Sequence, residues 1–379
     1  MQNHRLIALL IGLSLLLCGC GQSDEVESRA YVLVLGIDRT ENGDIGLTVR
    51  VPKIGNIGSE SSQKESAPDS PYLAFSTSGD TLYQALENLQ WIVPRTLSLS
   101  HLKLLVISEE LASEEDFKTT LNAVAELRHL YTAAKMVVST GKAKDLVETL
   151  DLVIDARLSS EITMAFHSLE KQGSIPESSL AEVYYAGNSI YADPVAPLGF
   201  VVVNNDPATS ESTFSALAPE VELSQIQAPG AVHLLGAAVF RNGSLAVKLN
   251  SEETLALNLI NRGVQAFDFA YEGGACQLVS SGHTQKTVSI AGNRVALELI
   301  LTLSTLDPID GATTRSIEAA IGSQLLSTIE NCQRANVDPF GFAEKAAQHF
   351  VSIQDWLSFH WRDHFADADV SVRVRINRQ

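Results

Sequence analysis

The sequence has few basic and few aromatic residues, and both shortages argue against a nucleic-acid-binding protein. Lys and Arg number 27 against 45 Asp and Glu, which gives a formal net charge of −18. Nucleic acid and anionic lipid are both held by clustered Lys and Arg, so neither nucleic acid nor anionic lipid is an expected electrostatic partner of this chain. Aromatic residues make up 6% of the chain and form no stripe interleaved with basic residues. A hydrophobic content of 45% still provides cores for two or three domains in 379 residues.

The sequence also lacks the motifs that carry common catalytic and metal chemistry. It contains no GxGxxG, no Walker A loop and no GxSxG. His360 and His364 have the spacing of a zinc protease, but Trp361 stands where such a protease needs a Glu. The segment from Asp38 has Val49 where a calcium loop needs a bidentate Glu, so we interpret it as a hairpin turn. We therefore predict no enzyme, no cofactor and no metal ligand.

Cysteine is scarce, with four residues in the chain, two of them within the first 20 positions. The other two, Cys276 and Cys332, show no metal-ligand pattern, and they can form a disulfide or remain two buried thiols. Residues 273–276 (GGAC) could form a nucleophile turn, but no His partner motif accompanies them. A tight turn leading into a strand is the better interpretation.

A single long apolar run is present, at residues 6–17, and its twelve residues are too few to cross a bilayer as a helix. The run fits the hydrophobic region of a signal peptide and is followed by Cys18-Gly19-Cys20. Together with Leu17, this segment resembles a bacterial lipobox. The resemblance implies removal of a signal peptide at 1–19 and a diacylglyceryl group on the Cys20 thiol, with acyl chains such as palmitate forming a lasting anchor. The alternatives are an ordinary secreted protein cut after a small residue and a short buried helix.

The first part of the body alternates strand and helix patterns, which indicates a mixed sheet with flanking helices. Residues 30–38 and 45–51 predict a hairpin with its turn at Asn42-Gly43, and a helix is predicted from Thr81. Further strands are predicted at 103–107 and 135–140, helices at about 109–128 and twice within 142–170, and exposed loops at 55–71 and 204–213. Residues 171–230 are rich in Ser, Pro, Ala and Asn, and we place the domain transition near the loop at 204–213.

The second part predicts antiparallel strands packed by helices. Its strands are predicted at 232–240, twice within 284–306, and at 370–377, and its helices at about 251–262, 314–334 and 340–353. Gly263 is a predicted C-cap. The alternation from Val370 to Asn377 is typical of a half-buried strand of an antiparallel sheet. The fold class predicted for the whole chain is α+β, with domains at 20–215 and 216–379.

Several segments, in the same order, resemble the C-subunit lipoproteins of bacterial spore germinant receptors, the Ger(x)C family. They are EVESRAYVLVLGIDRTENGDIGLTVRVP at 25–52, GDTLYQAL at 79–86, SHLK at 100–103, ELA at 110–112, the hairpin at 235–245, DPFGF at 338–342, Trp361, Phe365 and the strand at 370–378. We assign these residues structural roles: close packing or a turn for Gly36 and Gly79, a hydrogen bond at a strand start for His101, and core positions for the aromatic residues.

The resemblance implies a lipid-anchored, non-catalytic subunit of a nutrient germinant receptor. Such a subunit acts in receptor assembly or signal relay at the outer, exported face of the spore inner membrane. Its implied partners are the membrane, through the lipid on Cys20, and the integral membrane A-type and B-type subunits. Direct contact with the germinant stays open. A solute-binding lipoprotein of an uptake system is the alternative, and an exported hydrolase is a second one, for which the sequence offers no nucleophile or metal.

Overall fold

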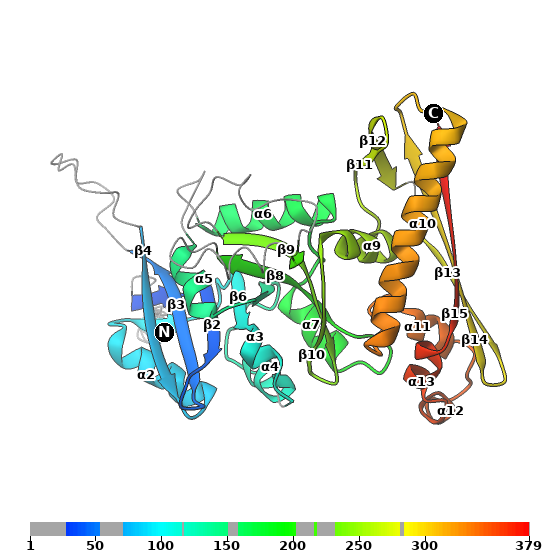
Figure 1. Cartoon of the computed structure of the whole chain (residues 1–379). Coiled ribbons are helices and arrows are strands. Elements are labelled where there is room, and N and C mark those ends of the chain that lie inside the picture. The colour runs from blue at the N-terminus through cyan, green and yellow to red at the C-terminus, as the bar shows by residue number, and fades with distance from the viewer. Residues whose placement is uncertain are drawn as a thin grey trace, which may run out of the picture.

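The computed structural model describes residues 28–53, 71–115, 117–150, 158–201, 216–217, 232–280 and 284–378. These residues form an elongated molecule with a large sheet at one end and a smaller sheet at the other (Figure 1). The predicted signal peptide, Cys20, the loop at 204–213 and all but the last residue of the loop at 55–71 lie outside this part of the chain. Within it, every helix is too short or too polar to cross a bilayer.

The large sheet has eight strands in the order β10-β9-β8-β7-β6-β2-β3-β4. They are β2 (Val34–Arg39), β3 (Ile45–Pro52), β4 (Tyr72–Gly79), β6 (Leu104–Ser108), β7 (Lys135–Ser139), β8 (Val195–Val201), β9 (Val232–Arg241) and β10 (Ser244–Leu249). Strands β2, β6, β7 and β8 run parallel, and antiparallel strands flank them on both sides. The hairpin predicted from Asn42-Gly43 is confirmed as β2–β3. Its first predicted strand is divided, because β1 (Arg29–Tyr31) pairs separately with β5 (Thr96–Ser98).

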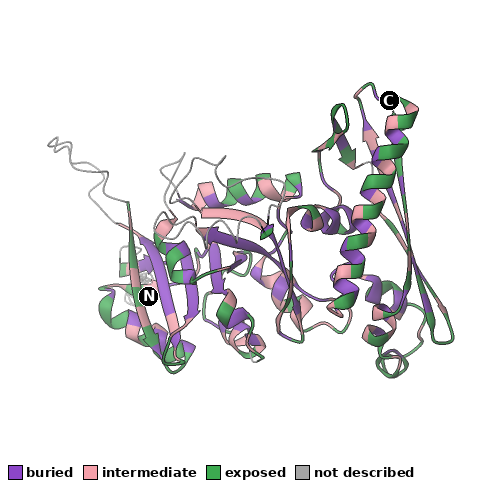
Figure 2. Ribbon diagram, viewed as in Figure 1, coloured by how far each residue is buried: buried purple, intermediate pink, exposed green. Residues whose placement is uncertain are grey.

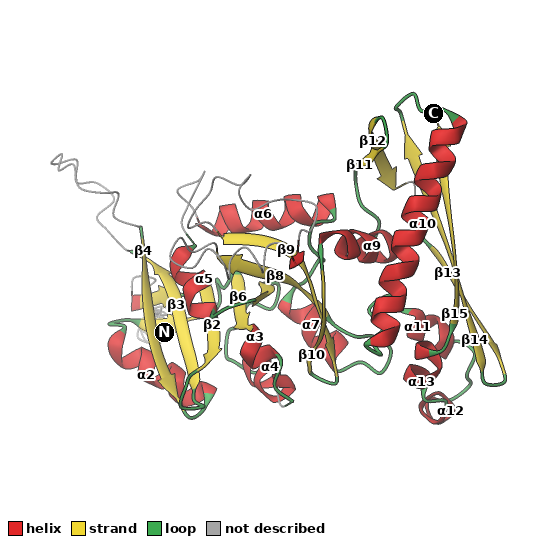
Figure 3. Cartoon of the chain, viewed as in Figure 1, coloured by secondary structure: helices red, strands yellow, loops and turns green. Residues whose placement is uncertain are grey.

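Helices cover both faces of the large sheet (Figure 3). One face carries α2 (Leu82–Ile92), α3 (Glu109–Ala112), α4 (Phe117–Ala125) and α7 (Leu180–Gly187), and the other carries α5 (Ala143–Thr149) and α6 (Leu158–Gln172). Central strands are therefore buried on both sides, as Figure 2 shows, which explains their continuous apolar runs. Leu105 packs in the first layer and Val106, its neighbour, in the second.

Local sequence signals fix several of these elements. Thr81 caps α2, since its hydroxyl accepts a hydrogen bond from the backbone N–H of Gln84 at 3.2 Å. Gly36 lets α5 approach the sheet, because a Cβ there would lie 2.8 Å from Val147 Cγ2. Gly79 is similarly close to α2, with a Cβ placed 2.7 Å from the backbone nitrogen of Ala85. The packing roles predicted for both glycines are confirmed.

The C-terminal half is built on a smaller five-stranded sheet and a long helix. Its strands are β11 (Phe267–Tyr271), β12 (Gly274–Ser280), β13 (Gln285–Ala291), β14 (Arg294–Thr305) and β15 (Asp369–Arg378). Its helices are α9 (Ser251–Asn261), α10 (Gly311–Arg334), α11 (Phe342–Ala347), α12 (Ile353–Ser358) and α13 (Trp361–Ala366). Buried side chains of α10 at a spacing of four, such as Ile321 and Leu325, join the core formed by Leu299 and Leu301 of β14.

Two predictions for this half need correction. Strand β15 pairs with β14 in parallel, not antiparallel, register. The alternation of Val374 and Ile376 identifies the buried face, but parallel and antiparallel ladders both permit that alternation. The helix predicted at 340–353 ends at Ala347, and Val351 is fully exposed before α12 begins. The α+β class itself is confirmed, with mixed sheets and helices in both halves.

Strand β9 belongs to both halves of the molecule. Its Ala238 and Phe240 lie in the core beneath α2, α4 and α7, while Ala237 and Val239 lie in the core that includes α9 and α10. Because β9 and β10 pair into the large sheet, that sheet continues past residue 216. The division into domains at 20–215 and 216–379 stays a prediction.

Candidate functional site

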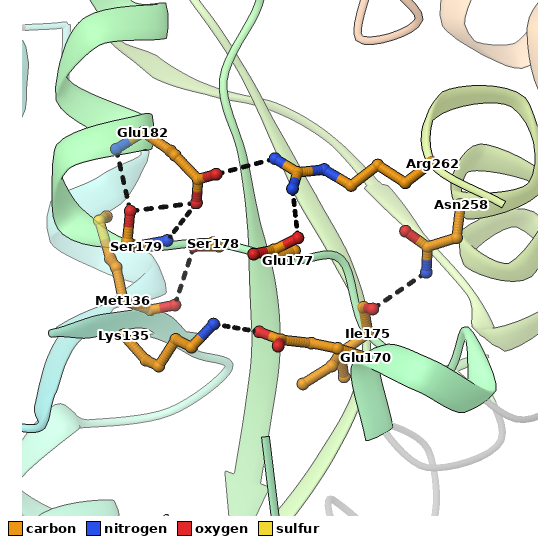
Figure 4. Close-up of polar contacts among 10 residues, drawn as sticks. All are labelled: Lys135, Met136, Glu170, Ile175, Glu177, Ser178, Ser179, Glu182, Asn258 and Arg262. Carbon is orange, nitrogen blue, oxygen red and sulfur yellow. Dashed lines mark hydrogen bonds and ion pairs between the residues drawn. The ribbon is translucent and has the colours of Figure 1, made fainter. Parts of the chain in front are cut away.

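Two groups of charged side chains join the N-terminal half of the molecule to the C-terminal half. We call the region of these contacts the junction and treat it as the candidate site. The first group, the arginine cluster, consists of Arg262, Glu177 and Glu182. Arg262 follows the last residue of α9 and reaches the segment that leads into α7 (Figure 4). Its Nη1 donates to Glu177, and its Nη2 donates to Glu182 Oε1 at 2.8 Å. One guanidinium thus joins α9 to the start of α7.

Glu182 is fixed in this position by the start of its own helix. Ser179 and Glu182 form a capping box, in which each side chain accepts a hydrogen bond from the other's backbone N–H. Burial acts to raise the pKa of Glu182, but the hydrogen bond from the Ser179 backbone and the Arg262 guanidinium outweigh it and lower the pKa. Burial acts to lower the pKa of Arg262, whereas the two glutamates raise it overall. The pair therefore stays charged near neutral pH.

Two further contacts support the same segment (Figure 4). Asn258, on the inner face of α9, donates from Nδ2 to the carbonyl oxygens of Gly173 and Ile175, both at 2.9 Å. Lys135, at the start of β7, forms an ion pair with Glu170 of α6, with its Nζ 2.5 Å from Glu170 Oε1. Burial raises the pKa of Glu170 in spite of that lysine. Helix α9 is consequently held by neutral and charged contacts to the segment between α6 and α7, and Lys135 ties α6 to the large sheet.

The Arg262→Met substitution tests how much the arginine cluster contributes to stability. Arg262 is 52% exposed and its partners are 43% and 42% exposed, so solvent screens both ion pairs. We expect a loss of about 0.5–1 kcal/mol in the free energy of unfolding, measured by urea denaturation. Arg373→Met, which removes a 3.8 Å pair with Glu298 on β14, is the matched surface control. A loss above about 2 kcal/mol would contradict the conclusion that solvent screens the ion pairs of the arginine cluster.

The second group, the aspartate cluster, is more deeply buried and joins the segment before β8 to the C-terminal helices. Arg362 of α13 donates to both carboxylate oxygens of Asp193, at 2.8 and 2.5 Å. Asp193 also accepts from the backbone N–H of Asp338 at 2.7 Å. The Asp193 side chain is only 3% exposed and that of Arg362 is 36% exposed, so the carboxylate end of this bidentate pair is shielded from water.

Asp338 is the centre of the aspartate cluster. Its carboxylate accepts hydrogen bonds from the backbone N–H groups of Phe340, Phe342 and Ala343 and from Trp361 Nε1. Burial raises its pKa to about 6, and these donors offset only part of that effect. The carboxylate accepts four hydrogen bonds from the protein, and this favours a role in holding the structure together over a role as a general acid or base.

Beside the aspartate cluster lies a pocket of about 380 Å³, lined by residues of both halves. Arg241 and Asn336 line it, and Arg241 Nε and Asn336 Oδ1 are buried without a hydrogen-bond partner in the described part of the chain. Asn242, Asn336 and His360 also line the pocket with positive φ angles of 52°, 55° and 51°. Backbone in this region is costly for residues with a Cβ, and it concentrates at functional sites.

The residues that the sequence analysis excluded as metal ligands have other partners. Asp38 is hydrogen-bonded to the start of α5. Its carboxylate accepts from the backbone N–H groups of Ala143 and Lys144, at 2.7 and 2.9 Å. His364 stacks on Phe359 with ring centroids 4.2 Å apart. In the described residues, no three His, Cys, Asp or Glu side chains gather as a metal site requires.

The cysteines are two separate thiols, not a disulfide. Cys276 and Cys332 are both free and buried, and burial raises the pKa of each thiol. Gly273 lies in the turn between β11 and β12, and residues 274–276 are the first residues of β12, which agrees with the predicted turn leading into a strand. His101 is hydrogen-bonded as predicted, with Nδ1 3.0 Å from Ser100 Oγ, but it lies in a turn three residues before β6 and not at the start of a strand. The predicted core positions of Phe340, Phe342, Trp356 and Trp361 are confirmed.

Sequence reasoning missed the residues that make the junction. Asp193 and Arg362 are 169 positions apart, and Arg262 and Glu182 are 80 apart. No local pattern identifies either pair. Asp338 offered a signal, because an Asp shortly before a helix often caps it, and here its carboxylate accepts from the first turn of α11. The predicted lipid site, Cys20, lies outside the described residues.

Comparisons with known proteins match both halves. Residues 22–199 match the family described as Spore germination protein N-terminal domain, and residues 235–379 match Spore germination B3/GerAC like, C-terminal. The chain belongs to the Ger(x)C family. The two matched regions leave residues 200–234 between them, and the second begins within β9.

Relatives in Bacillus subtilis (strain 168) extend this Ger(x)C match over the whole chain. Spore germination protein KC is 24% identical over 99% of this chain and 95% of its own length. Putative spore germination protein YfkR is 22% identical over 94% and 91%. The crystal structure of the GerBC protein shares the fold, with a TM-score of 0.53 and 14% identity over 90% of this chain and 96% of that one.

Proposed function

We propose that this Ger(x)C protein is a lipid-anchored, non-catalytic subunit of a nutrient germinant receptor. It acts in receptor assembly or signal relay at the outer face of the spore inner membrane. The observation that carries the proposal is the match of both halves, in order, to spore germination domains. The lipobox-like segment ending at Cys20 supports the anchor and the exported side. The partners are the integral membrane A-type and B-type subunits.

The junction supports a relay role. Strand β9 contributes alternate side chains to the two cores, so the halves share a rigid element. The arginine and aspartate clusters add ion pairs between the two halves. A partner that displaces the large sheet would therefore also displace the C-terminal sheet. Coupling of this kind needs no catalytic residue, which agrees with a carboxylate cluster that is saturated by donors.

Affinity purification of the tagged protein from spore inner membranes in mild detergent tests the receptor assignment. We expect two integral membrane proteins to be recovered with it, in constant ratio. A lipid confines the chain to two dimensions and raises its effective concentration near such partners. Recovery of the chain alone, under conditions that keep another membrane complex intact, would contradict the assignment.

The Cys20→Ala substitution tests the anchor. We expect wild-type protein to take up labelled palmitate and to sediment with membranes, and the variant to lose the label completely. Cys18→Ala is the matched control, because it changes the neighbouring cysteine and leaves Cys20 in place. Electrophoresis of the variant separates loss of the lipid from retention of an uncleaved signal peptide. Labelling of the Cys20→Ala protein equal to wild type would rule out Cys20 as the acceptor.

The pocket at the junction favours a solute-binding lipoprotein as the second candidate function. Its volume is in the range of small-molecule sites, and Arg241 and Asn336 offer a buried donor and a buried acceptor there. Thermal unfolding with a panel of amino acids and sugars tests whether the chain binds a solute, and the purification above decides between the two functions. A midpoint that rises with the concentration of one solute, in a chain recovered without the two membrane proteins, would favour uptake, and an unchanged midpoint would contradict it.

A further inference from the structure

The end of the molecule farthest from β13–β15 carries an exposed apolar surface, which we call the terminal face (Figure 1). It consists of Leu73 on β4 and Trp91 and Ile92 at the end of α2, which are 42%, 78% and 50% exposed. A hollow of about 400 Å³ adjoins it and is lined mostly by apolar side chains, including Phe75 and Val93. Single exposed apolar residues are ordinary, but an aromatic, two aliphatics and an apolar hollow together indicate a contact surface.

The chain enters the fold at this same face. Arg29 and Ala30 of β1 line the hollow, and the described residues begin at Ser28, eight positions after Cys20. Eight residues span at most about 28 Å even when fully extended. An acyl group on Cys20 would hold the terminal face within that distance of the bilayer. The C-terminal sheet, at the opposite end in Figure 1, would project away from it.

The charges around the terminal face give no net attraction to a bilayer, and Glu87 is exposed on α2 one helical turn before Trp91. Arg29, Lys53 and Arg95 line the hollow, in a chain whose net charge is −18. The acidic residues of the connecting sequence, Asp24, Glu25 and Glu27, balance these three cations in number. Attraction to anionic lipid therefore contributes little, and the apolar side chains must carry the contact. Trp suits this role, because its ring buries apolar surface while its N–H stays at the level of the headgroups.

We propose that the terminal face rests on the bilayer, with Trp91 and Ile92 inserted at the headgroup level. The proposal depends on the lipid anchor of the proposed function, and it adds an orientation: the lipid and the terminal face together would stand the elongated body end-on. A two-point contact of this kind restricts rotation about the tether, which a single lipid chain attachment does not. The large sheet would then be the half nearer to the membrane.

Tryptophan fluorescence tests this contact on the full-length, acylated chain. Of the three tryptophans, Trp356 and Trp361 are only 4% and 6% exposed, so the difference between wild type and Trp91→Phe isolates the exposed ring. The protein is reconstituted into phosphatidylcholine vesicles with and without bromine in the acyl chains. We expect brominated lipid to quench the Trp91 signal about twofold or more, and the same signal to lose most of its sensitivity to aqueous acrylamide. Adding anionic phosphatidylglycerol should change neither result.

A matched control moves the reporter to another exposed position. Tyr185 on α7 is 72% exposed, so Tyr185→Trp in the Trp91→Phe background presents an equally accessible ring away from the terminal face. We expect no quenching of this ring by brominated lipid. If the chain floats with vesicles but Trp91 stays open to acrylamide and insensitive to bromine, the terminal-face contact is wrong and the anchor stands. If the chain carries no acyl group and does not float, the anchor fails, and the terminal-face contact fails with it.

Discussion

Replacing Arg362 by Met should destabilise the protein by about 3 kcal/mol, the largest loss that we expect from removing one charged side chain at the junction. The substitution removes both guanidinium donors from Asp193, whose side chain is 3% exposed. The carboxylate would keep the backbone N–H of Asp338 as a donor, but its charge would lie buried and uncompensated. Urea denaturation at pH 7.5 measures the loss.

Two further variants establish where that loss comes from. In the double variant Asp193→Asn/Arg362→Met, the buried charge is gone, so we expect about half of the single-variant loss to be recovered. Arg373→Met, on the exposed face of β15, should cost less than about 0.5 kcal/mol. If Arg362→Met behaves like Arg373→Met, the Asp193–Arg362 pair does not stabilise the junction. Separate unfolding transitions in Arg362→Met would show that this pair also couples the two halves.

Local signals predicted the elements whose causes are local. Asn42-Gly43 gave the β2–β3 hairpin because Gly43 adopts a positive φ of 87°, which its lack of a Cβ permits. Helices α2 and α10 followed from apolar residues at helical spacing. Gly263, predicted as the cap of α9, also has a positive φ and donates to the carbonyl of Asn258.

Elements with weak local signals were missed. Strand β8 contains Pro197 and Gly199, which the sequence favours as loop residues, and its pairing with β9 shifts register between them. Strand β4 has an apolar first half and a polar second half and lies at the edge of the large sheet, so no apolar alternation identifies it. Helix α7 is short and lies in a stretch rich in Ser, Pro, Ala and Asn. The sequence pattern predicted the α+β class correctly. It did not predict these elements, because their positions depend on pairing and packing with distant parts of the chain.

The junction was beyond sequence reasoning for a different reason. Its contacts join residues that are far apart in the chain, and an isolated Asp or Arg is most often a solvated surface residue. The buried role of Asp38, which accepts from backbone N–H groups more than 100 positions away, illustrates the same limit. Family resemblance pointed to spore germination where the local chemistry offered no motif.

The titration of Asp338 should make the stability of the junction depend on pH. Burial raises the pKa of this carboxyl to about 6 from an ordinary value of 3.8, and the neighbouring Asp193 acts in the same direction. The folded protein therefore binds a proton more tightly than the unfolded chain does. The contribution of Asp338 to stability is fully present below pH 3.8 and is lost as the pH rises through about 6. At about 1.4 kcal/mol per pKa unit, the whole difference corresponds to about 3 kcal/mol.

Comparison with Asp338→Asn isolates this group from the other acids. The free energy of unfolding of wild type, minus that of the variant, should increase by about 2–3 kcal/mol between pH 7.5 and pH 4. Trp361 provides a second readout, because its Nε1 donates to Asp338 Oδ2 at 3.1 Å. Its fluorescence should change with a midpoint near pH 6 in wild type and not in the variant.

Imidazoles in general titrate in the same range, and His360 lines the adjoining pocket, so His360→Gln serves as the control and should keep the transition. A pH-independent difference between wild type and Asp338→Asn would mean that the carboxyl titrates as it does in water. The raised pKa that burial gives it would then be wrong. A confirmed transition would show that one buried carboxyl makes the junction between the halves sensitive to protons, while the Arg262–Glu182 pair stays charged.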